Sequence, residues 1–289
     1  GMSGGVDSSV AAYLLKEQGY DVIGVTMQIW QKEDNQTVEE NGGCCGLSAV
    51  DDARRVANML EIPYYVMNFK HEFRENVIDY FIQEYLKGRT PNPCIACNRY
   101  VKWEALLNRS LAIGADYIAT GHYARISRNE ETGRYLLKKA LDPKKDQSYV
   151  LYNMTQEQLS RTIFPLGEMT KAEARALAEK CGFDNADKPE SQDICFIPDG
   201  SYADFIENYT GKIYPPGDFV SRDGNVLGRH KGIIRYTVGQ RKGLGLALKK
   251  PGYVCGIDTE KNEVIIGDNS DLFTRKFRIR DMNLIACSS

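Results

Sequence analysis

The sequence lacks any long hydrophobic run and any visible secretory signal. Its 289 residues contain no stretch of about 18 apolar residues, the length that a membrane-spanning helix requires. We therefore expect a cytoplasmic protein with no membrane partner. Its eight cysteines are expected to be reduced, because disulfide scaffolds belong mainly to small secreted domains. Metal binding, catalysis or packing must then explain them.

The commonest phosphate-binding fingerprint, Gly-x-x-x-x-Gly-Lys-Ser/Thr, is also absent. The chain opens instead with a glycine- and serine-rich turn, Gly1 to Ser9, ahead of a helical pattern that ends at Gly19. Glycines let the backbone approach a ligand, and the free N–H groups of a helix start favour an anion. Asp7 or Ser8 could also simply cap the helix. The order Ser-Gly-Gly-x-Asp-Ser exceeds what a cap needs, so we predict a phosphate-binding loop.

Acidic residues are missing from two long stretches, although the whole chain carries a net charge of −2. One of these stretches runs from Tyr85 to Trp103. A solvated face would explain such charge runs, and so would a surface that binds a polyanion such as nucleic acid. The other stretch runs from Gly224 to Ile257, and its basic residues are Arg229, Lys231, Arg235, Arg241, Lys242, Lys249 and Lys250.

Strand and helix patterns alternate in the first part of the chain, which predicts an α/β fold with a parallel sheet. A glycine turn normally follows a strand, so we expect a first strand that this sequence does not include. The expected helices cover residues 10–19, 49–60, 73–86 and 103–111, and the expected strands cover 20–30, 63–68 and 117–122.

The pattern changes past residue 165. A short helix is expected over 170–181, with Thr170 as its cap, followed by a loop-rich segment and a helix over 202–209. Glycine-broken β-prone runs at 217–220, 253–257 and 263–267 then predict a small β-rich domain. We expect domains at 1–165, 166–210 (a connector that carries Cys195), 211–276 and 277–289, the last with a strand at 277–286.

Cys94 and Cys97 form a Cys-x-x-Cys pair between prolines and asparagines, which predicts a rigid, accessible loop. Arg89 and Arg99 nearby would favour the thiolate form. Structural zinc usually needs a second such pair, and the adjacent Cys44-Cys45 does not provide it. A thioredoxin-type redox pair is disfavoured because that motif begins a helix, whereas prolines precede this one.

Cys195 and His122 admit two interpretations each. Cys195 is either a buried cysteine of a strand or a functional thiol. His122 follows a predicted strand, where open α/β sheets bind ligands, so we favour a site role over simple packing. Cys181, Cys255 and Cys287 have apolar or small neighbours and are interpreted as buried hydrophobic residues.

Taken together, the motifs resemble the tRNA-specific 2-thiouridylases, a family of the ATP pyrophosphatase-loop superfamily that exchanges the C2 oxygen of wobble uridine 34 for sulfur. The resemblance covers nearly the whole chain. It implies an adenine-nucleotide α-hydrolase-like domain, a small β-rich domain and a C-terminal β-barrel, of which only the start is expected at 277–289. The motifs lie at 1–8, 88–93, 97–98, 119–123, 145–149, 194–197 and 237–245.

The resemblance also implies roles for single residues. Cys195 would receive sulfur as a persulfide from a donor protein, and Cys97 would be the partner thiol, leaving a Cys97–Cys195 disulfide. Mg²⁺ would lie near Asp7. Asn92, Pro93 and Cys94 would face the target base in the tRNA anticodon loop, while His122, Lys145, Asp146 and Gln147 would contact tRNA. The implied ATP contacts are Gly1, Met2, Ser3, Gly4, Gly5, Val6, Asp7, Ser8, Met27 and Gly121.

Three alternatives remain open at this point. Many relatives have Asp where this chain has Cys94, so Cys94, Cys97 and Cys195 could together hold a 4Fe–4S cluster. A metabolic amide synthetase or ligase would keep the ATP loop and use the cysteines structurally. An RNA-binding adaptor would keep the loop only as a vestige.

Overall fold

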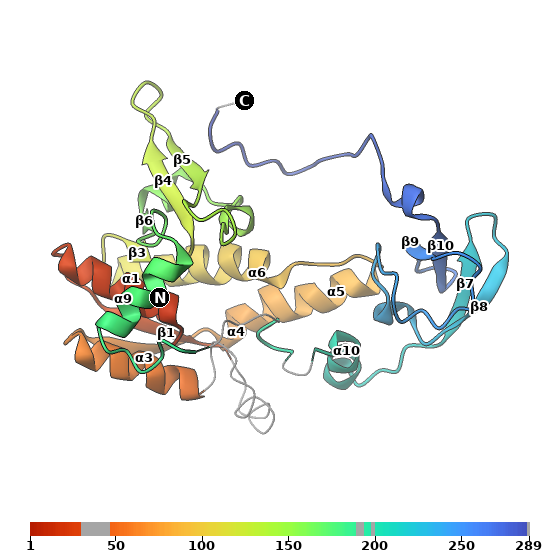
Figure 1. Ribbon diagram of the computed structural model, residues 1–289, viewed down its shortest axis with the longest axis horizontal. Coiled ribbons are helices and arrows are strands. Elements are labelled where there is room, and N and C mark those ends of the chain that lie inside the picture. Colours follow the sequence, from red (N-terminus) through yellow and green to blue (C-terminus); the bar gives the residue numbers. More distant parts are fainter. Residues whose placement is uncertain (30–46, 189–193, 198–199, 288–289) are drawn as a thin grey trace. The chain divides into compact units, whose positions relative to one another are not determined.

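The computed structural model describes residues 1–29, 47–188, 194–197 and 200–287 (Figure 1). Cys44 and Cys45 lie outside the described residues, as does the end of the strand expected over 20–30. The chain divides into two units, which are described separately below. The first comprises Gly1–Val77, Cys94–Pro198 and Met282–Ser289, and the second comprises Ile78–Pro93 and Asp199–Asp281.

The first unit contains parallel strand pairs, as the alternating pattern predicts. Strand β1 (Gly24–Gln28) pairs with β2 (Tyr64–Asn68), and β3 (Ile118–Ala119) pairs with β6 (Thr162–Ile163). The opening residues connect the two pairs: Met2 N donates to the Val25 carbonyl and Gly1 N to the Ala119 carbonyl, both at 2.7 Å. The predicted parallel α/β architecture is confirmed.

Three helices bury the apolar side of the first unit. Helices α1 (Val6–Glu17), α3 (Leu47–Met59) and α9 (Lys171–Lys180) share one core, and Figure 1 shows α1 and α9 side by side. Thr170 caps α9 in a reciprocal capping box with Glu173, so the predicted cap is confirmed. The N-cap of α1 is Gly5, which has no side chain, so neither Asp7 nor Ser8 caps that helix.

The prediction of a rigid loop around the Cys-x-x-Cys pair is wrong. Cys94 lies in α6 (Pro93–Ala96) and Cys97 begins the π-helical segment η3 (Cys97–Leu106), which continues into α7 (Leu107–Ala112). Pro93 is the first helical residue, where its missing N–H has no partner to lose and its fixed φ suits the helix. The argument that this motif cannot begin a helix therefore fails.

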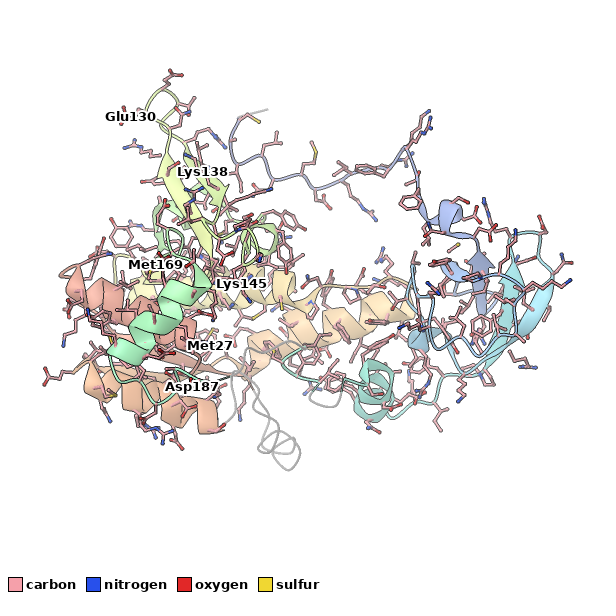
Figure 2. The ribbon with its side chains drawn as sticks, viewed as in Figure 1. Met27, Glu130, Lys138, Lys145, Met169 and Asp187 are labelled. Atoms are coloured by element: carbon pink, nitrogen blue, oxygen red, sulfur yellow. The ribbon has the colours of Figure 1, made fainter. Side chains whose placement is uncertain are left out.

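The helix expected over 73–86 is split into α4 (Lys70–Phe73), the π-helical η2 (Arg74–Asp79) and α5 (Tyr80–Leu86). An unpredicted antiparallel hairpin, β4 (Ala124–Arg128) and β5 (Tyr135–Lys139), follows β3. Figure 2 shows Glu130 at the tip of this hairpin. The first unit also contains η4 (Ser148–Val150) and α8 (Gln156–Ser160).

The second unit contains α5, α10 (Tyr202–Thr210) and a four-stranded sheet of order β8-β7-β10-β9. Its core includes the fully buried Phe219, Val254 and Val264. Only β7 and β10 pair in parallel. Its strands are β7 (Gly217–Ser221), β8 (Val226–His230), β9 (Tyr253–Asp258) and β10 (Glu263–Gly267), and its 3-10 turns are η5 (Ile233–Arg235) and η6 (Asn269–Leu272).

The β-rich prediction for this part of the chain is confirmed, although β8 was not expected. The segment at 277–286 forms no strand in the described structure, so that prediction is wrong. Its end instead contacts the first unit, to which it belongs: Asn283 Nδ2 donates to the carbonyls of Tyr152 and Met154 at 2.8 and 2.9 Å. None of the helices within the described ranges is both long and apolar enough to cross a membrane.

Candidate active site

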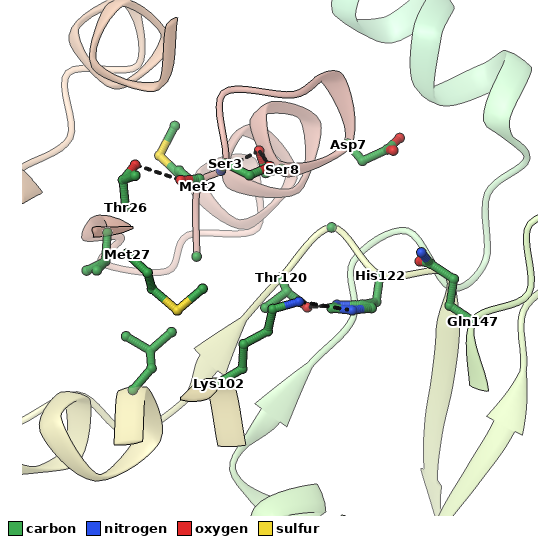
Figure 3. Close-up of a pocket in the computed structure, with 14 residues that line it drawn as sticks. Met2, Ser3, Asp7, Ser8, Thr26, Met27, Lys102, Thr120, His122 and Gln147 are labelled. Atoms are coloured by element: carbon green, nitrogen blue, oxygen red, sulfur yellow. Dashed lines mark hydrogen bonds between the residues drawn. The ribbon is translucent and has the colours of Figure 1, made fainter. Parts of the chain in front are cut away.

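A pocket of about 180 Å³ lies in the first unit, where β1 and β3 end and α1 begins (Figure 3). Of the predicted ATP contacts, Gly4, Gly5 and Val6 do not line this pocket: Gly4 and Gly5 lie just before α1, and Val6 is the first residue of that helix. Its lining residues are Gly1, Met2, Ser3, Asp7, Ser8, Val25, Thr26, Met27, Lys102, Leu106, Thr120, Gly121, His122 and Gln147.

Hydrogen bonds fix the shape of the opening loop. Ser3 N donates to Ser8 Oγ at 3.1 Å, and Ser8 Oγ donates to the Gly5 carbonyl at 3.0 Å. Asn185 Nδ2 donates to the Gly4 carbonyl at 3.0 Å. Gly4 has φ +71°, and a Cβ there would lie 2.3 Å from the carbonyl oxygen of Ala49. The start of α1 is therefore presented to the pocket by a rigid loop that suits an anion.

Gly121 brings the end of β3 into direct contact with this loop. A Cβ at position 121 would lie 2.6 Å from the carbonyl carbon of Asp7 and 2.7 Å from Ser8 N. Only glycine permits this approach of two backbone segments. The contact confines the pocket between the loop and β3.

Asp7 is the one carboxylate among the residues that line the described pocket. Its Oδ1 accepts a hydrogen bond from Tyr123 Oη at 2.8 Å, and Lys171 Nζ donates to both of its oxygens at 2.7 and 2.8 Å. The Lys171 side chain is 13% exposed and that of Asp7 31%. Mg²⁺ commonly uses one or two carboxylates together with substrate phosphates, so Asp7 could serve as such a ligand.

His122 is held on three sides. Its Nδ1 lies 2.7 Å from Thr120 Oγ1 and its Nε2 lies 3.5 Å from Lys102 Nζ (Figure 3). The ring packs on Trp103 and Phe164, with centroids 5.4 and 6.0 Å away. Burial, reinforced by the positive charge of Lys102, lowers the pKa of His122 well below its usual value of 6.5, so the ring is neutral.

The cysteines of interest fall in different environments. Cys94 is exposed, while Cys97 and Cys195 are half-buried. Next to Cys195, the buried Phe196 packs edge-on against Phe73 with ring centroids 5.8 Å apart. Cys287 is exposed, so its interpretation as a buried residue is wrong. Throughout residues 1–29, 47–188, 194–197 and 200–287, no three His, Cys, Asp or Glu side chains are grouped to hold a metal ion.

The sequence matches the family described as tRNA methyl transferase HUP domain over residues 1–199, and the tRNA methyl transferase PRC-barrel domain over residues 203–268. It is 69% identical over 286 residues to the tRNA-specific 2-thiouridylase MnmA of Lachnoclostridium phytofermentans, covering 99% of this chain and 80% of that protein. This chain belongs to the tRNA-specific 2-thiouridylase family.

Two further members of the 2-thiouridylase family are similar over the same range. The proteins of that name from Acetivibrio thermocellus and Clostridioides difficile are 59% and 56% identical, each covering 99% of this chain and 80% and 79% of the relative. A solved U34-tRNA thiolase, NcsA of Methanococcus maripaludis with its 4Fe–4S cluster, is 20% identical with a TM-score of 0.42, covering 72% of this chain and 64% of that one. That likeness is too distant to support an argument.

The residues that the family resemblance associates with tRNA lie in different surroundings. Gln147 lines the pocket and accepts from Tyr123 N at 2.9 Å. Asp146 instead holds its own turn, accepting from Ala140 N at 2.9 Å and Ser148 Oγ at 2.8 Å. Lys145, labelled in Figure 2, is half-buried and does not line the pocket. Asn92 and Pro93 belong to the second unit.

Sequence reasoning missed several residues of the site. Lys102 and Thr120 line the pocket, and Tyr123 and Lys171 hold Asp7. Thr120 and Tyr123 flank Gly121 and His122, so their proximity could have been inferred from the sequence. The approach of Lys171 to Asp7 spans 164 residues, and no local pattern indicates it.

Proposed function

We propose that this protein catalyses ATP-dependent 2-thiolation of wobble uridine 34 in tRNA. In the proposed reaction the uridine C2 oxygen is adenylated, pyrophosphate leaves, and sulfur then displaces AMP. Adenylation is needed because the oxygen alone is a poor leaving group, and splitting the exchange into two steps lowers the barrier. Sequence identity of 69% to a named 2-thiouridylase across 99% of this chain is the observation that carries the proposal.

The pocket suits ATP in its residue types. The rigid loop, the helix start of α1 and the hydroxyl of Ser3 offer neutral donors for phosphate oxygens, whereas the hydroxyl of Ser8 already donates to the Gly5 carbonyl. Val25, Met27 and Leu106 supply apolar surface for a base. We propose that Gly1 to Ser8, Met27 and Gly121 bind ATP, with Asp7 as a ligand of phosphate-bound Mg²⁺.

For sulfur transfer we propose a persulfide relay. A donor protein converts Cys195 to its persulfide, and the thiolate of Cys97 attacks the inner sulfur to form a Cys97–Cys195 disulfide. The hydrosulfide so released attacks C2, and AMP leaves with the bonding electron pair. A thiol reductant then returns both cysteines to the reduced form.

Recognition of the substrate completes the proposal. We assign Asn92, Pro93 and Cys94 to the target base, and Lys145, Asp146 and Gln147 to the tRNA. We assign His122 to the tRNA as well, and because His122 and Gln147 both line the nucleotide pocket, their proposed contacts with tRNA lie at that pocket. The described cysteines do not form a three-thiolate group, so no step is routed through an iron–sulfur cluster.

The deciding experiment incubates the complete chain with tRNA, MgATP and a persulfide donor, and measures 2-thiouridine by mass spectrometry of digested tRNA. We expect sulfur at uridine 34 with the wild type and with the matched control C181S, and none with C97S or C195S. Absence of sulfur with the wild type would refute the proposal. Pyrophosphate release that does not depend on tRNA would favour a metabolic amide synthetase. Full function of the D7A variant would favour an RNA-binding adaptor.

Iron content separates the two sulfur routes. The chain is reconstituted anaerobically with iron and sulfide, and its absorbance and bound iron are measured before the same thiolation assay. The relay predicts thiolation by iron-free protein supplied with a persulfide donor. Activity that requires bound iron and is lost in C94S would establish the cluster instead.

A further inference from the structure

The phosphate loop carries no positive charge of its own. Residues 1–9 include no Lys or Arg, whereas the commoner phosphate loop places a lysine on the phosphates. Among the residues that line the described pocket, Lys102 is the one lysine or arginine, and His122 is neutral. A reaction at a phosphate builds negative charge in its transition state, and a fixed cation is the usual means of stabilising it.

Lys102 lies on the same π-helical segment as Cys97. Segment η3 runs from Cys97 to Leu106, and both Lys102 and Leu106 line the pocket. In a π-helix, residues i and i+5 are joined by the backbone hydrogen bond, so Cys97 and Lys102 are about one turn apart on similar faces. One segment thus carries a cysteine of the proposed relay and the cation of the nucleotide pocket.

The contact that Lys102 makes is with a neutral acceptor. Its ammonium can only donate, so His122 Nε2 accepts at 3.5 Å, and His122 Nδ1 carries the proton that is donated to Thr120 Oγ1 at 2.7 Å. Within the part of the chain that the structure describes, no carboxylate pairs with Lys102. Lys171, by contrast, is neutralised by Asp7. Lys102 therefore keeps its full charge for a ligand in the pocket.

We propose that Lys102 binds the α-phosphate of ATP through Nζ and stabilises the charge that develops there during adenylation. The α-phosphate is assigned because it must face the uridine, on the side of the segment that carries Cys97.

As the uridine oxygen forms its bond to phosphorus, the bond to the β-phosphate breaks and pyrophosphate leaves with the electron pair. The N3 proton of uridine passes to water, and Lys102 stays protonated. His122 holds the ammonium in place before ATP arrives. This inference rests on the proposed function.

The test compares K102M, K102Q and K102R with K180M, a matched control because Lys180 is an exposed lysine of α9 in the same unit. Each complete chain is mixed with tRNA and MgATP, and pyrophosphate release is measured over a range of ATP concentrations. Thermal unfolding of each variant identifies those that keep the wild-type fold. We expect a folded K102M or K102Q to lose about 100-fold in kcat with only a small rise in KM, because a transition-state contact is lost. K102R is expected to retain part of the rate, and K180M all of it.

A folded K102M or K102Q whose kcat stays within about twofold of the wild type would overturn the inference, since such a lysine contributes nothing to the transition state. A purely structural lysine predicts a different pattern, in which unfolding temperature falls and kcat per folded molecule does not. Failure of the wild type itself to release pyrophosphate with tRNA would count against the proposed function, so the two failures are distinguishable.

Discussion

Lys171 Nζ donates to both carboxylate oxygens of Asp7, at 2.7 and 2.8 Å. This pair ties the first residue of α9 to the first turn of α1, two helices that share one core. Tyr123 Oη reaches the same carboxylate from the segment after β3. Three separate parts of the chain therefore fix the orientation of Asp7, the one carboxylate among the residues that line the described pocket.

Replacing Lys171 with methionine should uncouple Asp7 from α9. Because the lysine is mostly buried, we expect the free energy of unfolding to fall by about 1.5–3 kcal/mol, as for the loss of a hydrogen bond to a charged group. Pyrophosphate release should slow by about tenfold, equivalent to ~1.4 kcal/mol in activation free energy, because Asp7 is no longer oriented. Denaturant unfolding and the pyrophosphate assay measure the two effects.

A double-mutant cycle with D7N tests whether the pair acts as a unit. If it does, adding K171M to D7N should cost much less in rate than K171M costs alone. Strictly additive losses would show that Lys171 acts on something other than Asp7.

Gly121→Ala should damage the pocket through a backbone clash. The new methyl group would lie 2.6 Å from the Asp7 carbonyl carbon, so either the loop or the end of β3 must move. We expect a loss of about 1–3 kcal/mol in unfolding free energy from overpacking, and at least about a tenfold weaker affinity for ATP. Isothermal titration with ATP measures the second quantity.

Gly256→Ala is the matched control, because a Cβ there meets its nearest neighbour, Ile265 Cδ1, at an ordinary 3.4 Å. It should leave ATP binding unchanged. If G121A bound ATP as tightly as the wild type, the close approach of Gly121 would have no role in shaping the pocket.

Two histidines, the half-buried His122 and the buried His230, predict how stability depends on pH. Burial lowers the pKa of His122 well below 6.5, and burial also lowers that of His230 against the opposing effects of Asn262 and Asp218. Below pH 6.5 the unfolded chain therefore takes up protons that the folded chain does not. The contribution of these two histidines to the free energy of unfolding is complete above about pH 6.5, and it falls as the pH drops toward their folded pKa values.

Unfolding free energies measured between pH 5 and pH 7 test this dependence in the whole range where histidine titrates. The variant H122N should flatten the curve substantially, and H230N to a smaller degree. An H122N curve as steep as that of the wild type would show that His122 is not held neutral in the folded protein.

Local patterns in the sequence were sufficient for much of the fold. The strands β1 and β2 follow from apolar, β-branched runs, and α9 follows from the cap at Thr170. The hairpin β4–β5 escaped detection because in β5 the apolar residues Tyr135, Leu136 and Leu137 are consecutive, so that strand does not alternate apolar and polar residues. Pro93 was interpreted as part of a loop because proline suits both a loop and the first position of a helix.

The site was predictable only where it is local. The loop at Gly1 to Ser8 and the Gly121-His122 pair are contiguous motifs, and the structure places both around one pocket. Lys171 reaches Asp7 from the start of α9, and Lys102 lines the pocket from a π-helical segment; neither placement leaves a short-range mark in the sequence. Such residues require a three-dimensional arrangement before they can be found.

The capping box of α9 offers a last test, because it sets the position of Lys171. Thr170→Ala removes the side-chain acceptor for Glu173 N and should lower the free energy of unfolding by about 1 kcal/mol. Since Lys171 is the first residue of that helix, the variant should also slow pyrophosphate release.

Thr155→Ala is the matched control, because it breaks the same kind of capping box at α8, with a similar expected loss of about 1 kcal/mol. The α8 variant should keep the wild-type rate, because α8 supplies no residue to the described pocket. Equal rates for the two variants would mean that the start of α9 does not position Asp7 through Lys171.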